Sequence, residues 1–244
     1  MHYKAEYKMT NKQKILMIVP ILVTPLLCFV ALHSNRYLVP VICILPAYPV
    51  MVYALKMGRR NIAIMLMVLW ALLLGLSMTV CIYRYPEAAK YSILNGEKYK
   101  KEMIEWVLTG VGTEGNPMQF IPIHIVELVA FIILSLLSGS IVSILMGAVL
   151  MNYMAYYVAH LAAMGHSSAL FVLGWHPWSV LRISAYILLG VLLSEPLISR
   201  ISHYNYQFTD TRNLLKIAFC LWVLDMMVKT LFASTWRGIL QSLL

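Results

Sequence analysis

The sequence predicts an all-α fold, a polytopic bundle of transmembrane helices. Of its 244 residues, 61% are hydrophobic and only 12% are charged, which is about half the usual charged share of roughly 25% in globular domains. The apolar residues form runs long enough to cross a hydrocarbon core of ~30 Å as helices, and no stretch alternates over ~10 residues as barrel strands do. Residues 1–244 are therefore expected to form a single membrane domain with the lipid bilayer as its main partner.

Hydropathy predicts seven spans along the chain. They cover residues 15–33, 37–55, 61–83, 120–138, 141–163, 177–198 and 214–232. The first two spans hold half of the ten prolines, at Pro20, Pro25, Pro40, Pro46 and Pro49. Because each proline removes a backbone donor, these two helices are expected to be kinked.

Two interpretations of residues 120–165 stay open. As one helix, these 46 residues would be roughly 69 Å long at 1.5 Å per residue, far more than a bilayer needs. A turn near Gly139 would give a helical hairpin and seven spans. A stripe of small residues at a spacing of four instead suits a continuous helix to about residue 150, followed by a re-entrant segment, which would give six spans. The stripe consists of Ser135, Gly139, Ser143 and Gly147. The hairpin is preferred because it keeps most basic loops on one side of the membrane.

The basic residues predict the orientation. Four Lys lie before the first span, three Lys or Arg follow the second, and three more lie between Arg200 and Lys216. Basic residues beside spans favour the cytoplasmic side, so the N-terminus is expected to be cytoplasmic in a plasma-type membrane. The net charge of +9 is thus explained by topology, without a nucleic-acid partner. Residues 84–119 then form an extramembrane segment between spans three and four.

One amphipathic helix is predicted within that extramembrane segment, between Gly96 and Gly110. Its apolar face carries Tyr99, Met103, Trp106 and Val107, and Lys and Glu occupy the rest. This pattern is typical of a helix lying in the membrane interface. A small cap packed on the end of the bundle would give the same pattern.

Ionisable residues inside the spans are candidates for function. Asp225 and Lys229 are one helical turn apart, with the acid first, and are expected to form an ion pair within one helix. They could neutralise each other or relay a proton or ion in a transporter. Arg182 and Glu195 lie near opposite ends of the sixth predicted span and are expected to anchor it at the two interfaces.

Histidines near one face of the predicted bundle suggest a metal site. If the hairpin turns near residue 142, His124 and His160 meet at the same depth, and Glu127 lies one turn from His124. The candidate ligands for zinc, iron, copper or haem iron are His124, Glu127, His160, His166 and His176. Hydrogen bonding of these histidines at the membrane interface is the alternative. No catalytic motif is present, which favours a non-enzymatic protein.

Residues 122–139, "PIHIVELVAFIILSLLSG", resemble the stage II sporulation protein M-like membrane family. In that family a Pro-His-Gly segment leads into a Glu-Leu helix rich in small residues. The residues that match this pattern are Pro122, Glu127, Leu128, Ala130 and Gly139, whereas His124 is displaced by one position. The resemblance implies a multi-spanning protein with a structural or assembly role, or one that works beside a transporter and other membrane proteins.

Two functions are therefore predicted. The first is a non-enzymatic multi-pass membrane protein that either has a structural or assembly role or allows a small solute to pass. The second is a membrane metalloprotein or haem protein that uses the histidines of one face as ligands.

Overall fold

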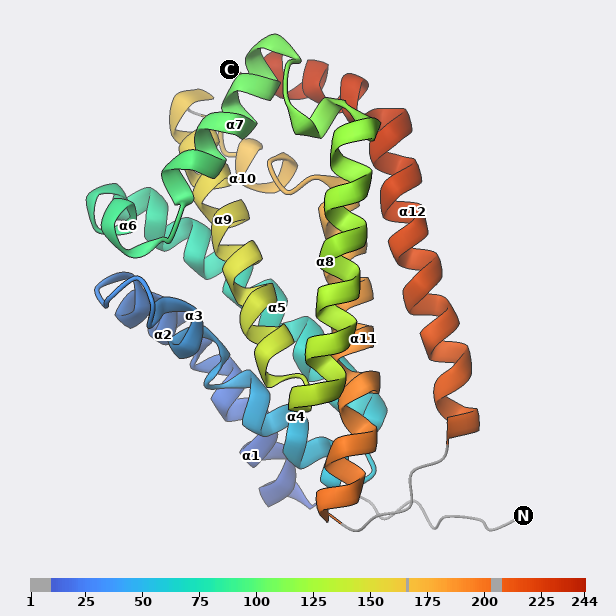
Figure 1. Cartoon of the computed structure of the whole chain (residues 1–244). Helices are drawn as coiled ribbons and strands as arrows, with labels where there is room; N and C mark the ends of the chain where they lie inside the picture. The colour runs from blue at the N-terminus through green and yellow to red at the C-terminus, as the bar shows by residue number, and fades with distance from the viewer. Residues whose placement is uncertain (1–9, 166, 203–207) are drawn as a thin grey trace.

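The computed structural model describes residues 10–165, 167–202 and 208–244, with no side-chain description at 208–210. In these ranges the chain is helical (Figure 1). Its helices are α1 (Asn11–Leu22), α2 (Thr24–Leu32), α3 (Val39–Ile44), α4 (Ala47–Lys56), α5 (Arg60–Arg84), α6 (Pro86–Ser92), α7 (Gly96–Thr109), η1 (Thr113–Gly115), α8 (Pro117–Ser138), α9 (Ile141–Gly165), α10 (Leu170–Leu173), α11 (Pro177–Ser202) and α12 (Phe208–Gln241).

Seven helical segments within the described ranges are long and apolar enough to cross a membrane. Two of them are helix pairs, α1 with α2 and α3 with α4, and the others are α5, α8, α9, α11 and α12. The predicted helical membrane bundle is therefore confirmed. The side on which the N-terminus lies and the identity of the membrane stay predictions.

Prolines divide the first two spans, as the sequence predicts. The first span breaks at Val23, two residues before Pro25, which is the second residue of α2. The second breaks at Leu45 and Pro46, between α3 and α4. Proline lacks the amide hydrogen that would continue the helical ladder, so each span bends at these points.

The hairpin between α8 and α9 is confirmed, and the continuous helix is not. α8 ends at Gly139, which has φ +60°, and Ser140 follows with φ +70°. Such left-handed residues end a helix and reverse the chain. The Ser140 hydroxyl donates to the Gly190 carbonyl of α11 at 2.6 Å, and the Ser135 hydroxyl donates to that of Ser143 at 2.8 Å. The small residues thus let the two hairpin arms approach each other closely, and the turn between them contacts α11.

Helix α7 caps one end of the bundle. Its residues Met103, Trp106 and Val107 are buried against α9, α10 and α12. The helix ends at Gly110, whose φ of +79° suits glycine. The predicted apolar face is present, and it packs on the bundle. The structure therefore favours the cap interpretation of the amphipathic pattern.

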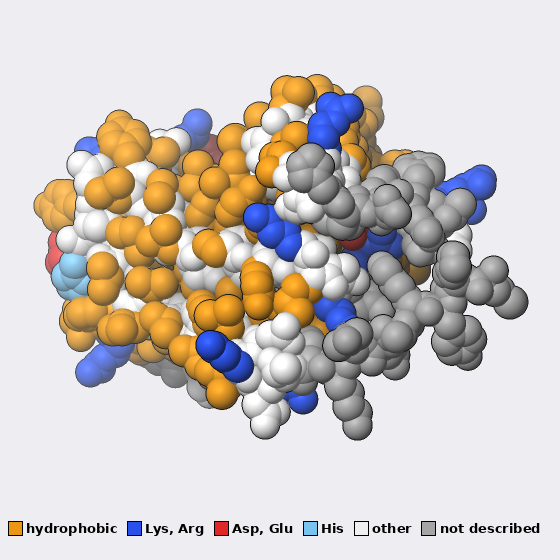
Figure 2. Space-filling view, turned by 90° about the horizontal axis from the view of Figure 1, so that it is seen from below, with side chains coloured by type: hydrophobic (Ala, Val, Ile, Leu, Met, Phe, Trp, Pro, Cys, Tyr) orange, Lys and Arg blue, Asp and Glu red, His pale blue; other side chains and the backbone are white. Residues whose placement is uncertain are grey.

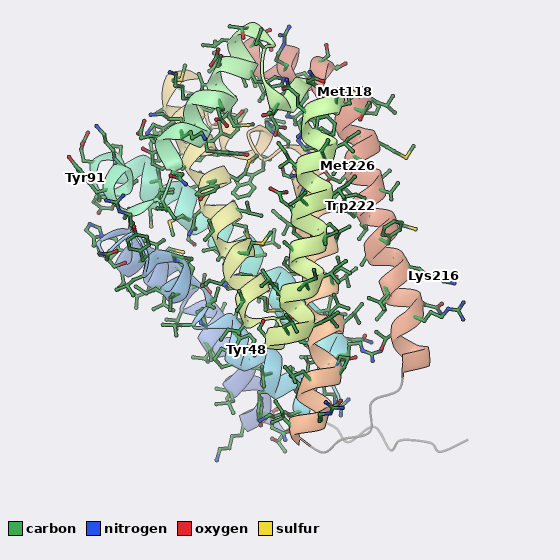
Figure 3. The ribbon with its side chains drawn as sticks, viewed as in Figure 1. Tyr48, Tyr91, Met118, Lys216, Trp222 and Met226 are labelled. Atoms are coloured by element: carbon green, nitrogen blue, oxygen red, sulfur yellow. The ribbon has the colours of Figure 1, made fainter. Side chains whose placement is uncertain are left out.

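The spans form two packed groups. Helices α1 to α5 share a core with α9 and one side of α11, whereas α8, α11 and α12 share another. In Figure 3, Trp222 and Met226 of α12 point toward α8 and α11, while Lys216 points away from the bundle. Figure 2 shows the end opposite α7, where Lys and Arg side chains lie among hydrophobic ones. The space between α8, α9 and α11 holds the candidate functional site.

Candidate functional site

His124 and Glu127 lie deeper in their span than the sequence predicts. Helix α8 begins at Pro117, three residues earlier than the predicted span, so His124 is its eighth residue and Glu127 its eleventh of 22. At 1.5 Å per residue, Glu127 is ~15 Å along the helix. The pair is therefore near the middle of α8, where an ionisable group needs partners.

Lys229 of α12 supplies one of these partners. Its side chain is 1% exposed, and its Nζ lies 2.9 Å from Glu114 Oε1 and 3.3 Å from His124 Nε2. It also lies 4.2 Å from the centre of the Phe120 ring, a cation–π distance. Lys229 thus connects α12 with η1 and α8.

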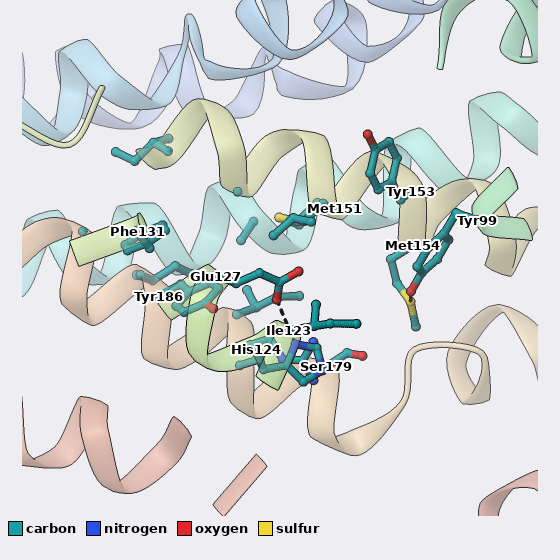
Figure 4. Close-up of a pocket in the computed structure, with 18 of the residues that line it drawn as sticks. Tyr99, Ile123, His124, Glu127, Phe131, Met151, Tyr153, Met154, Ser179 and Tyr186 are labelled. Carbon is teal, nitrogen blue, oxygen red and sulfur yellow. Dashed lines mark hydrogen bonds and ion pairs between the residues drawn. The ribbon is translucent and has the colours of Figure 1, made fainter. Parts of the chain in front are cut away.

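The hydrogen bonds of Lys229 fix the proton on His124. An ammonium group can donate hydrogen bonds but cannot accept one. His124 Nε2 must therefore accept from Lys229, and the ring proton must be on Nδ1. That Nδ1 lies 2.8 Å from Glu127 Oε2 and donates to it (Figure 4). The result is a continuous chain from Glu127 through a neutral His124 to Lys229 and Glu114.

Arg182 and Asp225 form a second ion pair beside this chain. Arg182 Nε and Nη2 donate to the two Asp225 oxygens at 2.8 and 3.1 Å, and the Asp225 side chain is fully buried. The sequence predicts an Asp225–Lys229 pair within α12, but the structure gives each residue a partner on another element. The reason is packing, since α11 brings Arg182 next to Asp225 and η1 brings Glu114 next to Lys229. We name Glu114, His124, Glu127, Arg182, Asp225 and Lys229 the polar cluster.

Glu195 lies toward the opposite end of α11 and also has a partner. Arg60 of α5 donates to both of its oxygens at 2.7 and 2.6 Å, and Arg60 Nη2 donates to Thr211 of α12 at 2.8 Å. Neither Arg182 nor Glu195 is the isolated interface anchor that the sequence predicts. Both instead connect α11 to neighbouring helices.

Glu114 holds its negative charge strongly. Burial alone would raise the pKa of this carboxyl, but the attraction of Lys229 and other nearby cations outweighs burial and holds the pKa at about 2. One oxygen, Oε1, is bonded to Lys229. The other, Oε2, is buried without a hydrogen-bond partner in the described part of the chain, so Glu114 retains an unused acceptor.

A cavity of about 450 Å³ adjoins the polar cluster, between α8, α9 and α11 and under α7 (Figure 4). Its charged lining consists of Lys98, Glu102, Glu114, Glu127, Arg182 and Lys229. Its apolar lining includes Phe131, Ile144, Leu150, Met151, Ile187 and Val191. This volume lies within the ~300–1,000 Å³ typical of small-molecule sites. The lining therefore suits a molecule with one polar end and an apolar body.

The cavity is open beside α8. Ile123 and Glu127 both line it, yet Ile123 is 47% exposed and the Glu127 side chain 24% exposed. On α9, a Cβ added at Gly147 would meet no atom within 4 Å. If these helices span the bilayer, this opening faces lipid, so a membrane-dissolved molecule can reach the cavity sideways.

The remaining predicted ligands lie elsewhere. His160 hydrogen-bonds the Tyr156 carbonyl at 2.8 Å and packs on the Tyr156 ring. His176 is fully buried between Trp106 and Trp178 and lies 3.3 Å from the Tyr157 hydroxyl. His166 lies outside the described residues. Of the four candidates that the structure describes, only His124 and Glu127 lie together.

No group of three or more His, Cys, Asp or Glu side chains in the described ranges is placed to hold a metal ion. The metal and haem alternative thus lacks an assembled ligand set there. Glu114 is the member of the cluster that sequence reasoning missed, because it lies in an extramembrane segment with no pattern that points to Lys229. The Arg182–Asp225 pair, in contrast, has a signal in the sequence. These two residues carry opposite charges in adjacent spans, which favours an ion pair between the spans.

Comparison with protein families, curated proteins and solved structures gives no match. The resemblance of residues 122–139 to the stage II sporulation protein M-like family, and the assembly role it implies, therefore stay predictions.

Proposed function

We propose that this protein is a non-enzymatic multi-pass membrane protein that binds a small solute in the cavity between α8, α9 and α11 and lets it pass. The observation that carries this proposal is the cavity itself, which has a charged end and an apolar end inside the bundle. Ionisable groups at such depth are costly and are typical of solute or ion pathways.

Two sets of ion pairs lie toward opposite ends of the bundle and support passage. Lys229–Glu114 and Arg182–Asp225 hold α11, α12 and η1 together near α7. Arg60–Glu195 holds α5 to α11 at the opposite end. Passage requires these contacts to open in turn, and the breaks in the first two spans provide hinges near α5 and α9.

A pair of glycine variants tests the binding step. Gly147 and Gly238 are both helical, and a Cβ at either meets no atom within 4 Å, but only Gly147 lines the cavity. Leucine favours a helix over glycine by up to about 1 kcal/mol, so both variants should fold. Gly147→Leu should fill the cavity, whereas Gly238→Leu is the matched control.

The measurement is mass spectrometry of small molecules that remain bound to the protein purified in lipid nanodiscs. Wild type and Gly238→Leu should release the same molecule, and Gly147→Leu should release about tenfold less, which corresponds to a loss of ~1.4 kcal/mol. Equal amounts from all three proteins, or no bound molecule in any, would contradict the proposal.

A further inference from the structure

The polar cluster contains more negative than positive groups. At their ordinary charges Glu114, Glu127 and Asp225 contribute three negative charges, Arg182 and Lys229 contribute two positive ones, and His124 is neutral by its hydrogen bonds. Lys98 and Glu102, which also line the cavity, cancel each other. One negative charge is left without a cation.

That charge belongs to Glu127. Within the described ranges Asp225 is paired with Arg182 and Glu114 with Lys229, whereas Glu127 is hydrogen-bonded to the neutral His124. Its side chain is 24% exposed at the cavity opening. A carboxylate at the middle of a span normally requires a cationic partner, so the cavity is the place from which that partner can come.

The size and the lining of the cavity indicate which kind of cation it can bind. The cavity is far larger than a bare metal ion, and aromatic rings line it at Trp70, Tyr99, Phe120, Phe131, Tyr153 and Tyr186. Aromatic faces attract organic ammonium groups, and the apolar walls suit a hydrocarbon body. A hydrated inorganic ion would leave most of the apolar wall in contact with water instead of with hydrocarbon.

We infer that the solute is a lipophilic amine, whose ammonium group is held by Glu127 and whose apolar body lies along α9 and α11. This inference rests on the proposed solute-binding function and names the class of solute. Glu114 Oε2, the buried acceptor without a partner, offers a further hydrogen bond to a donor on the same molecule. The opening beside α8 lets such a molecule enter from the bilayer.

Three probes that differ only in their head group test the charge of the solute. Octylamine, octanol and octanoate are titrated by calorimetry into protein in phosphatidylcholine nanodiscs, with empty nanodiscs as the blank for partition into lipid. Octylamine should bind about tenfold or more tighter than octanol, and octanoate should bind more weakly than either. Equal affinities for the three would overturn the amine assignment.

Variants locate the interaction. Glu127→Gln keeps the size of the side chain and should reduce octylamine binding to the level of octanol, whereas Glu87→Gln, on α6 outside the cavity, should bind octylamine as wild type does. Unchanged octylamine binding in Glu127→Gln would contradict the inference.

The two proposals fail differently. If octanol and octanoate bind as well as octylamine and Gly147→Leu abolishes all three, the cavity binds solutes but the amine class is wrong. If none of the three binds, or if Gly147→Leu changes nothing, the solute-binding function fails as well.

Discussion

Lys229 shows how a lysine is accommodated at depth in a span. It is almost fully buried and interacts at once with a carboxylate, an imidazole and an aromatic ring. Removing a charge from water is expensive unless each of its donors finds a partner. Glu114 carries the charge opposite to that of Lys229. The contribution of Glu114 to the free energy of unfolding should therefore depend on pH.

The direction of that dependence follows from the pKa of Glu114, which is about 2 in the folded protein against an ordinary 4.5. A lowered pKa in the folded state stabilises the protein above the ordinary value, and this contribution is lost as the pH falls toward 2. Glu114→Gln should therefore be clearly less stable than wild type at neutral pH, and the difference should shrink between about pH 5 and pH 2.

Unfolding monitored by tryptophan fluorescence across this pH range measures the effect. Glu105→Gln, a change at an exposed position of α7, serves as the control and should follow the wild-type curve. A difference between wild type and Glu114→Gln that stays constant with pH would show that the Glu114 charge does not stabilise the fold.

At the scale of helices, the Arg182–Asp225 pair holds α11 against α12. Asp225 is fully buried and receives two hydrogen bonds from Arg182. Breaking a buried pair from one side leaves an unpartnered charge and costs on the order of 3 kcal/mol or more, whereas replacing both residues by apolar ones of similar size is often tolerated.

Arg182→Met should therefore be strongly destabilising, and adding Asp225→Leu should recover most of the lost stability. A double-mutant cycle on unfolding free energies measures the coupling. The Glu97–Lys100 pair on α7, 2.6 Å apart and partly exposed, is the comparison, and its loss should cost less than about 1 kcal/mol. Additive effects of Arg182→Met and Asp225→Leu would show that the pair does not couple the helices.

The element boundaries were largely predictable because hydropathy and turn chemistry are local. Pro25 and Pro46 mark the breaks in the first two spans, and Gly139 marks the hairpin turn. Hydropathy predicts a start of α8 three residues too late, because Pro117 to Gln119 are less apolar than the rest of the helix although Asn116 caps it. That small shift changes the depth of Glu127 by most of a helical turn.

At the scale of the whole molecule, the partners of the polar residues could not be predicted from one sequence. Local spacing favours Asp225 with Lys229, yet the helix arrangement gives them Arg182 and Glu114 instead. Such pairs depend on which helix faces which neighbour, and hydropathy does not contain that information. The same limit explains why His124 meets Lys229, while His160 lies on α9 beside Tyr156.

The cavity is a property of the assembled bundle, since α5, α7, α8, α9, α11 and α12 all contribute to its lining. The most direct test of solute binding in this cavity is a cryo-electron microscopy map of the protein in lipid nanodiscs, compared with a map of Gly147→Leu. If a lipophilic amine binds there, the wild-type map should contain an elongated non-protein density between α8, α9 and α11, with one end beside Glu127. The map of the variant should lack this density. Closely packed α8 and α9 with no such density, or the same density in both proteins, would contradict it.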